Sequence, residues 1–581
     1  MDTSIAAQRA AGARQLAGPV PGRAGALDPP AERVDVAVVG YGPVGAMVAN
    51  LLGQCGVRTA VLEKDTEPYN LPRAGATDDE VVRICQAAGL ADELLGHLDL
   101  GQTVQYVSGH GRLVASMHPA GGRCGYPRLA FFYQPDFERV LRRGVQRYDC
   151  VSVAMGLRAE ALCQDTDGVT VWARHGDRGR LSTVRARYVV GCDGGRSTVR
   201  SLCSIGFAGA TFAQPWLVVD AEVDAPVNGV PCFQFIGDPR RPAVTLPLPG
   251  GRHRWEFMVL PGEDHNQMAR LETAHRLISP WAGPGQARIL RHTVYTFHSR
   301  CASQWRSGRV LLAGDAAHLM PPFAGQGLSS GIRDAHNLCW KLAAVISGEA
   351  GPGLLDSYER ERRPHVARMT WLTRTAGALV QTRSPGLAAV RDAVLSRVGA
   401  VPRLGPYVQA MRFKPPLAYS EGAFHCGPRK GRGGTGRQFP QPRVRTAVGR
   451  LRLLDDLFGP GWALLGCGID PQVHLGSDSR AMWATLGARY VTVVPAGRRD
   501  HLRSEPGTSL VEDLDGYAVD WFARYGGDFV VLRPDRVVFV VMEARDLDSA
   551  AALYRELIPP APGTALRPAL TTGPATKLGG T

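Results

Sequence analysis

Three glycines near the N-terminus form a turn suited to phosphate binding. Gly40, Gly42 and Gly45 give the spacing G-x-G-x-x-G directly after a β-branched run at residues 34–39. The first glycine allows a tight turn, the second lets the backbone approach a pyrophosphate, and the third lets the next helix pack on the strand. The N-terminus of that helix favours the negative charge of phosphates. The motif therefore predicts a dinucleotide site, without distinguishing NAD from FAD.

Charged residues follow this turn where the rest of a dinucleotide is expected. A second strand at residues 59–62 ends at Glu63, whose carboxylate is expected to meet ribose hydroxyls. Arg73 lies in a loop one βαβ step further along and is a candidate for phosphate contact. A strand at residues 187–191 runs into a Cys-Asp-Gly sequence around Asp193, which predicts another ligand-facing turn before a helix.

A second glycine-rich turn lies farther along the chain. A strand at residues 310–313 ends in Gly314 and Asp315, and a loop with two prolines and several glycines leads into a long helix from about residue 330. Asp315 can accept a hydrogen bond from a ribityl hydroxyl. The loop offers backbone N–H groups to the edge of a flavin, and the helix N-terminus favours negative charge on a reduced flavin. A nicotinamide-dependent dehydrogenase would share the first motif but does not explain this second one.

Strand and helix patterns alternate around these turns, which predicts an α/β fold with a Rossmann-like FAD-binding domain. Residues 212–297 instead contain strand-like runs punctuated by Pro and Gly, which favours an inserted antiparallel sheet with one face for a ring compound. The expected parts are a disordered leader (1–33), the first part of the FAD-binding domain (34–211), a substrate-binding sheet domain (212–304), the second part of the FAD-binding domain with long helices (305–425), a linker (426–444), a C-terminal domain (445–562) and a tail (563–581).

Local patterns give more detailed expectations. Thr77 is expected to cap a helix at residues 78–88, with Glu80 completing a capping box. Alternating patterns predict hairpins, and apolar positions at helical spacing predict further helices. The hairpins are expected at residues 106–117 and 169–186, a separate short strand at 187–191, and the helices at 136–148, 354–381 and 546–557.

Composition limits the classes of partner. The formal charge is +14, but the basic residues are spread over the chain without a lysine tract, so nucleic-acid binding is not expected. No apolar run reaches the ~20 residues of a membrane helix. The twelve cysteines are scattered without a C-x-x-C pair or a Cys/His cluster at zinc spacing, so we expect no metal and reduced thiols in a cytoplasmic protein.

The three motifs, in this order, resemble those of the FAD-dependent aromatic hydroxylases of the para-hydroxybenzoate hydroxylase type, the class A flavoprotein monooxygenases. The stretches at residues 72–90 and 309–343 are most similar to 3-(3-hydroxyphenyl)propionate hydroxylases and to polyketide and antibiotic hydroxylases of secondary metabolism. The likeness covers roughly residues 34–415. The C-terminal domain resembles the thioredoxin-like extension of such enzymes. Its Cys467 stands alone, so no disulfide chemistry is expected and the domain should serve packing or oligomerisation.

The resemblance implies roles for particular residues. Relatives commonly have Asn where this chain has Ser329, a change that should preserve FAD binding and alter flavin mobility. The implied FAD contacts are Gly40, Gly42, Gly45 and Glu63 at the ADP half, Arg73 and Gln134 near the ribityl-pyrophosphate region, Asp193 near the pyrophosphate and the approach of NAD(P)H, Gly314 and Asp315 at the ribityl chain, Pro321, Gly325, Gly327, Leu328 and Ser329 along the isoalloxazine, and Asn337 close beyond it.

The resemblance also implies a reaction. NAD(P)H would reduce FAD, and O2 would then form a flavin C4a-hydroperoxide that hydroxylates an electron-rich phenolic or heteroaromatic ring. A side-chain base could assist, and His253, Tyr295 and His298 are candidates by location only, with structural roles favoured for each. A Baeyer–Villiger or epoxidising monooxygenase of a polyketide-like metabolite stays open as the alternative, because pocket shape decides the outcome. The identity of the aromatic substrate, the choice of NADH or NADPH, and a homo-oligomeric state also stay open.

Overall fold

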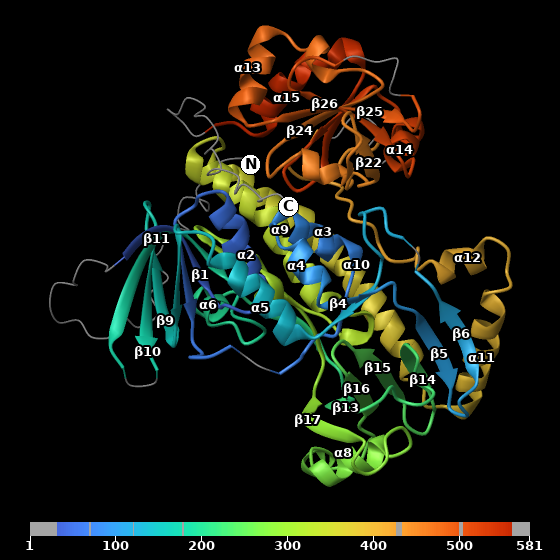
Figure 1. The fold of residues 1–581 in the computed structure, drawn as a ribbon. Coiled ribbons are helices and arrows are strands. Elements are labelled where there is room, and N and C mark those ends of the chain that lie inside the picture. The colour runs from blue at the N-terminus through green and yellow to red at the C-terminus, as the bar shows by residue number, and fades with distance from the viewer. Residues whose placement is uncertain are drawn as a thin grey trace, which may run out of the picture.

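The computed structural model describes residues 32–68, 71–119, 121–176, 179–425, 433–498 and 504–560. Nearly all of the expected leader, all of the expected tail and part of the expected linker lie outside these ranges. Three bodies are visible in Figure 1: a sheet-and-helix domain, a second sheet below and beside it, and a C-terminal domain above. No helix in the described ranges is both long and apolar enough to cross a membrane.

The first domain is built on an eight-stranded sheet. Its strands are β1 (Glu32–Val39), β2 (Thr59–Glu63), β8 (Val151–Met155), β9 (Leu157–Gln164), β10 (Val169–His175), β11 (Leu181–Gly191), β19 (Arg306–Ser307) and β20 (Val310–Leu312). The order β19-β20-β11-β1-β2-β8 places β1 at the centre, parallel to β2 and β11. β11 is one continuous strand where two were predicted, because its first half pairs with β10 and its second half with β20.

Helices cover this sheet. They are α2 (Pro43–Gln54), α3 (Asp79–Ala87), α4 (Ala91–Leu95), α5 (Gln134–Val145), α6 (Thr198–Leu202), α9 (Gln326–Ser347) and α10 (Asp356–Val380). α9 begins four residues earlier than predicted, since Gly325 with φ +62° supplies the left-handed residue that precedes it. The predicted capping box is wrong. Asp78 caps α3 by accepting from the Val81 N–H, while Glu80 is drawn to the buried Arg333 and Thr77 lies in β3 (Ala76–Thr77).

The second sheet has seven strands. They are β5 (Val104–Ser108), β6 (Leu113–Met117), β13 (Trp216–Val223), β14 (Phe233–Gly237), β15 (Ala243–Leu248), β16 (Arg252–Met258) and β17 (Ala287–Tyr295), in the order β17-β13-β16-β15-β14-β5-β6. β5 and β6 form the predicted hairpin but belong to this sheet, because β5 pairs in parallel with β14. The expected boundary at residue 212 therefore does not separate the two sheets, since an earlier segment crosses it.

Shorter elements complete this part of the chain. Helices α7 (His265–Met268) and α8 (Leu271–Ile278) lie near one face of the second sheet, and α11 (Pro385–Val398) and α12 (Leu404–Gln409) lie beside β6. Two three-stranded sheets join the bodies. They contain β3, β4 (Leu98–Leu100) and β7 (Ala130–Phe132), and β12 (Phe207–Thr211), β18 (His298–Ala302) and β21 (His318–Leu319).

The C-terminal domain has its own sheet. Its elements are β22 (Arg443–Thr446), β23 (Leu451–Leu453), β24 (Ala463–Cys467), α13 (Ser477–Thr485), β25 (Arg489–Pro495), β26 (Thr508–Asp513), α14 (Tyr517–Tyr525), β27 (Phe529–Leu532), β28 (Val538–Met542) and α15 (Ala550–Leu557). The core order β25-β24-β27-β28, with one parallel and two antiparallel pairings, is the thioredoxin-like arrangement. The last helix starts at residue 550, because residues 544–549 form a 3-10 turn.

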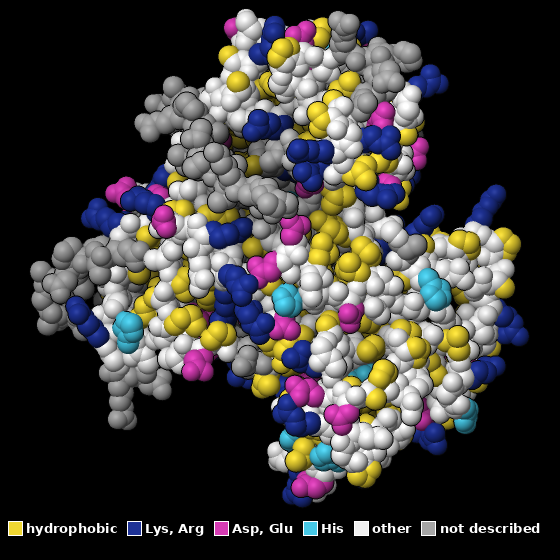
Figure 2. Space-filling model, viewed as in Figure 1, with side chains coloured by type: hydrophobic (Ala, Val, Ile, Leu, Met, Phe, Trp, Pro, Cys, Tyr) yellow, Lys and Arg dark blue, Asp and Glu magenta, His cyan; other side chains and the backbone are white. Residues whose placement is uncertain are grey.

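Charged side chains are interspersed over the surface. On the face shown in Figure 2, Lys and Arg alternate with Asp and Glu on all three bodies. The eleven cysteines of the described ranges are all free thiols, and no group of His, Cys, Asp or Glu there could hold a metal ion.

Candidate active site

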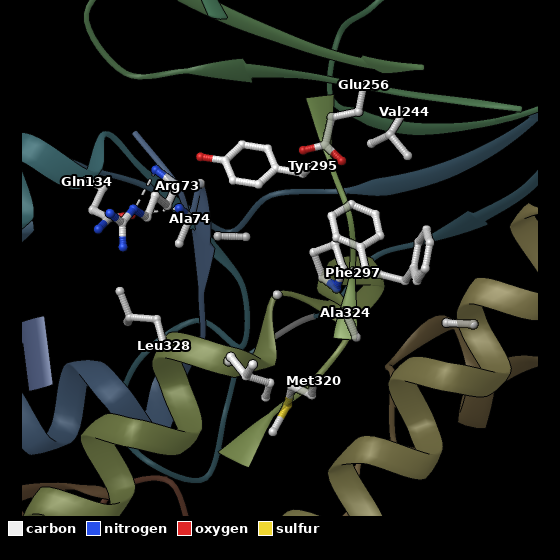
Figure 3. A pocket seen from close by; sticks show the side chains of 18 of the residues that line it. Arg73, Ala74, Gln134, Val244, Glu256, Tyr295, Phe297, Met320, Ala324 and Leu328 are labelled. Atoms are coloured by element: carbon white, nitrogen blue, oxygen red, sulfur yellow. Dashed lines mark hydrogen bonds between the residues drawn. The ribbon is translucent and has the colours of Figure 1, made fainter. Parts of the chain in front are cut away.

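A continuous cavity of ≈ 2030 Å³ runs from the glycine turn after β1 to the cleft between the second sheet and helices α10 to α12. The first domain lines one end, and aromatic and aliphatic side chains line the other. Figure 3 shows Arg73 and Gln134 on one side, Tyr295 and Glu256 above, and Leu328 from α9 below. A cavity of this size exceeds the usual ~300–1,000 Å³ of a small-ligand pocket, so it has room for a large cofactor and a substrate together.

The glycine turn has the geometry that a pyrophosphate requires. Gly40 has φ +101°, and a Cβ there would lie 2.5 Å from the Cys192 carbonyl oxygen. A Cβ at Gly45 would lie 1.9 Å from the Gly40 carbonyl oxygen, so this close helix–strand contact excludes any side chain. Gly42 lines the cavity with open space beside it, and α2 begins there without a side-chain cap. Free N–H groups of a helix N-terminus facing open space suit an anionic ligand.

Two acidic residues of the predicted set line this end of the cavity. Glu63 accepts hydrogen bonds from the backbone N–H groups of Tyr41 at 2.6 Å and Asp65 at 3.0 Å, which fix its carboxylate at the end of β2. Asp193 accepts from the Ser197 hydroxyl and from the Val199 N–H at 3.0 Å. Burial raises the pKa of Asp193, and these hydrogen bonds oppose the rise. Asp193 thus orders the turn before α6.

The Arg73 loop is held by helix α5 on one side and by strand β16 on the other. Gln134 accepts from the backbone N–H groups of Arg73 at 2.9 Å and Ala74 at 2.7 Å (Figure 3). From the other side, Arg254 of β16 donates to the carbonyl oxygens of Arg73 at 2.8 Å and Pro72 at 3.1 Å. Arg254 is not predictable from the sequence, because only the folded chain brings β16 to this loop.

The second glycine turn is organised by Asp334, which was not among the predicted site residues. Asp334 of α9 accepts from the Gly314 N–H at 3.1 Å and lies 2.6 Å from Nε2 of His318. Its other oxygen accepts from Arg362 at 2.8 Å. Asp334 could have been recognised from the sequence by its position among the apolar residues of α9, since an acid that is buried in a helix needs hydrogen-bond or ionic partners. Asp315 lines the cavity, and burial raises the pKa of its carboxyl.

The loop before α9 supplies part of the cavity wall. Gly325, Gly327 and Leu328 line it, whereas Pro321 and Gly314 do not, although their neighbours in the chain, Pro322 and Asp315, do. Ser329 is fully buried, and its hydroxyl has no hydrogen-bond partner in the described part of the chain.

Asn337 lies elsewhere. Its amide donates to Glu361 at 2.6 Å and Asp535 at 3.1 Å, at the boundary with the C-terminal domain. It does not line the cavity. The expected place beside the flavin is therefore corrected to a structural position, because the face of α9 that carries Asn337 packs on the C-terminal domain.

Of the three candidate bases, two line the cavity and one does not. His253 is buried outside the cavity, with Nε2 2.6 Å from the Thr245 hydroxyl, and burial lowers its pKa to about 3. Tyr295 and His298 both line the cavity. Nδ1 of His298 lies 3.0 Å from the Thr211 hydroxyl, and burial and Arg300 lower its pKa. Tyr295 lies on the wall opposite Leu328 (Figure 3).

These features fit FAD. The open N-terminus of α2 beside Gly42 suits a pyrophosphate, and a carboxylate at Asp315, which accepts no hydrogen bond from the described residues, suits a polyol. The mixed sheet with its glycine turn, joined through one cavity to an aromatic-lined sheet, is the arrangement of a flavoprotein with room for a second, apolar molecule.

Comparisons with known proteins identify the family. Residues 33–373 match the family described as "FAD binding domain", and the chain belongs to it. Residues 436–557 match the family described as "HcaD C-terminal domain". The chain is an FAD-dependent aromatic hydroxylase, as predicted, and the predicted α/β fold class is confirmed.

Individual relatives agree with this class. The chain is 40% identical over 535 residues to 3-(3-hydroxy-phenyl)propionate/3-hydroxycinnamic acid hydroxylase 2 of Burkholderia vietnamiensis, covering 91% of this chain and 97% of that protein. It is similar in structure to aklavinone-11 hydroxylase in complex with FAD and aklavinone, with a TM-score of 0.73, 25% identity and coverage of 92% and 100%. It is also similar to OxyS anhydrotetracycline hydroxylase from Streptomyces rimosus, with a TM-score of 0.70, 27% identity and coverage of 91% and 100%.

Proposed function

We propose that this hydroxylase uses NAD(P)H and O2 to add one oxygen atom to the ring of a phenol bound in the apolar part of the cavity. The observation that carries the proposal is the continuity of the cavity, which joins the glycine cradle to a chamber lined by aromatic rings. FAD, when bound, supplies the redox and oxygen-transfer chemistry. The chain then has to bind, orient and keep water out.

The residues at the cradle support specific roles toward FAD. We assign the ADP half to the turn around Gly42 and to Glu63, the ribityl-pyrophosphate region to Arg73 and the N-terminus of α2, and the ribityl chain to Asp315. The ring would lie against the loop with Gly325 and its neighbours. Gln134 and Asp334 act through backbone groups. Gln134 holds the loop of Arg73 and Asp334 holds the turn at Gly314, and we assign neither side chain a contact with the flavin ring.

The chamber beyond the cradle suits a flat arene. Phe233 and Phe235 pack edge to face at 4.6 Å between ring centroids, and Phe297 and Phe323 do so at 5.7 Å. All four line the cavity, and none carries a polar group. Such walls bind a ring through apolar contact and exclude water from the site.

The proposal is tested by purifying the protein with FAD and measuring NADH and NADPH oxidation in air, with and without a panel of phenols. Oxidation that accelerates with a phenol and yields a product heavier by one oxygen atom supports it. Accelerated oxidation that yields only hydrogen peroxide from every phenol contradicts the phenol assignment, and a protein that binds no FAD contradicts the whole proposal.

A further inference from the structure

We infer that the Glu256 carboxylate accepts a hydrogen bond from the hydroxyl group of the substrate, and that the site therefore selects neutral phenols over phenols that carry a carboxylate. The inference deepens the proposed function and rests on it. It rests on three observations: the place of Glu256 in the wall, the pairing of its neighbours, and the distribution of charge along the cavity.

Glu256 lies on the cavity face of the second sheet. Alternation along β16 places Glu256 and Arg254 on one face, and puts Trp255 on the other face, in the core shared with α8. Glu256 pairs across the ladder with Val244, which also lines the cavity. Figure 3 shows the carboxylate beside the ring of Tyr295, on the wall opposite Leu328.

The carboxylate of Glu256 has no donor of its own. Among the described residues no hydrogen bond reaches it, and the nearest cation, Nη1 of Arg254, is 3.8 Å away. Arg254 is already committed to Asp220 at 2.7 Å and to the carbonyl oxygens of the Arg73 loop. Arg291 likewise donates to the Pro72 carbonyl. A carboxylate with 16% of its side chain exposed into a cavity therefore keeps its acceptor capacity for a ligand.

The electrostatic surroundings strengthen this acceptor. Burial raises the pKa of Glu256, while Arg254 opposes the rise, Asp220 adds to it and Arg291 opposes it. A more basic carboxylate is a better hydrogen-bond acceptor, and a bond from a neutral hydroxyl to a charged oxygen is roughly twice as strong as one between neutral groups. Drawing the phenolic proton toward Glu256 also raises the electron density of the ring, which favours attack on an electrophilic oxygen.

Charge is segregated along the cavity. The lysine and arginine residues in its lining are Lys64, Arg73, Arg142, Arg158, Arg196, Arg254 and Arg300. Arg254 pairs with Asp220, Arg300 belongs to β18, and the others lie toward the dinucleotide end. The arm between β6 and helices α10 to α12 is lined by Leu113, Met117, Trp371, Leu379, Val408 and Phe413, among others, and the described residues of that arm include no Lys or Arg. An ionised carboxylate in this arm would lose part of its hydration and would find hydroxyl, imidazole and amide groups, such as those of Ser116, His118 and Gln409, but no lysine or arginine.

The test uses three probes that differ by one group each: 3-(3-hydroxyphenyl)propanoate, its methyl ester, and the methyl ether of that ester. Dissociation constants are read from the change in absorbance of FAD in the holoenzyme, and kcat/KM from product formation. We expect the wild type to bind the phenolic ester at least tenfold more tightly than the acid and than the ether. Tighter binding of the acid by the wild type overturns the inference without any variant.

The variant Glu256→Gln supplies the second arm. We expect it to weaken binding of the phenolic ester at least tenfold, to tighten binding of the acid, and to bind ester and ether alike. Glu222→Gln, at an exposed position of β13 that pairs with Arg288, is the matched control and should match the wild type. Unchanged ratios in Glu256→Gln overturn the inference. If that variant loses FAD, Glu256→Asp is measured instead, and it should retain the preference for the ester.

The proposed function and the role of Glu256 can be contradicted separately. If the wild type hydroxylates none of the probes or other phenols, the proposed function fails. If it hydroxylates phenols but the ratios of acid, ester and ether do not depend on Glu256, only this inference fails.

Discussion

The side-chain oxygen of Gln134 lies 2.9 Å from the backbone nitrogen of Arg73 and accepts its hydrogen bond. Gln134 also accepts from Ala74, and its amide nitrogen donates to Glu138 at 2.7 Å, so every polar atom of this buried side chain is used within the protein. The loop that carries Arg73 into the cavity is thereby fixed from the first turn of α5. Gln134 therefore acts through the loop, as a positioning residue.

Replacing Gln134 with Leu should weaken FAD binding. Two backbone N–H groups would lose a buried acceptor, at a cost of about 1–3 kcal/mol, and the Arg73 loop would lose its anchor. Titration of apo-protein with FAD should show a dissociation constant raised about tenfold. Gln146→Leu, at an exposed position beyond the end of α5, is the control and should leave it unchanged. Equal affinities in both variants would contradict the positioning role.

Substitutions at two glycines of the first turn should affect different properties, the stability of the fold at Gly45 and the affinity for FAD at Gly42. Gly45→Ala places a Cβ 1.9 Å from a backbone oxygen, so we expect low yield or a strongly reduced melting temperature even without FAD. At Gly42 a Cβ meets open space on the cavity side, so Gly42→Ala should fold as the wild type does and bind FAD more weakly. Melting of the apo-proteins and FAD titration make the comparison. The reverse pattern would show that the turn does not face the pyrophosphate.

Part of this site can be predicted from the sequence, because the backbone of the turn itself restricts which residues fit there. Gly40 and Gly45 are required by the turn itself, because no other residue tolerates these contacts, so the motif identifies the site without tertiary information. The strand that ends at Glu63 and the turn at Asp315 were found in the same way, from a strand followed at once by glycine or an acid.

The rest depends on contacts between segments that are far apart in the chain. Arg254 reaches the Arg73 loop across 181 residues, and β5 joins β14 across the domain boundary expected at residue 212. The family resemblance implies a place for Asn337 near the flavin, but which face of α9 meets the C-terminal domain follows only from the assembled fold. Periodicity gives a helix its faces and leaves their partners undetermined.

The C-terminal domain is fixed to the hydroxylase body by a buried charge cluster. Arg533, with no exposed surface, donates to both oxygens of Glu361 at 2.8 and 2.9 Å and also pairs with Asp535. Arg533→Met would leave two buried carboxylates short of a partner, at a cost of roughly 3–5 kcal/mol. We expect a clearly lower melting temperature in a single transition that includes flavin release.

The matched control for this variant is Arg443→Met. Arg443 pairs with Asp515, but 70% of its side chain is exposed, so the loss of stability should be much smaller than that of Arg533→Met. If Arg533→Met melts the C-terminal domain alone and leaves FAD bound at the wild-type temperature, the domain is an independent unit and this account of its packing is wrong.

Mild acid should destabilise the protein through buried neutral histidines. Burial lowers the pKa of His336 to about 4, and it also lowers those of His365 and His253. Each group binds a proton in the unfolded chain below about pH 6.5 but not in the folded one, so stability is full above that pH and falls as the pH drops toward the folded pKa. Asp79, whose pKa is raised to about 6, works in the opposite direction, as do other carboxyl groups whose pKa burial raises, among them Glu138 and Glu349.

The pH dependence of the urea midpoint between pH 7 and 4.5 tests this. We expect His336→Gln to lose less stability than the wild type as the pH falls across the range, because one of the groups that link stability to pH is removed. A parallel pair of curves would mean that His336 takes up its proton in the folded protein, contrary to its burial beside Arg83 and Arg536.

The most direct test of the central claim follows the oxygen atoms. Purified FAD-loaded protein is supplied with NADH or NADPH and a neutral phenol under 18O2, and the product is examined by mass spectrometry. The account predicts a ring-hydroxylated product that carries one 18O atom, with one nicotinamide coenzyme oxidised per product formed. A product without 18O, or a product in which oxygen has entered a carbon–carbon bond beside a carbonyl, would contradict aromatic hydroxylation by this protein.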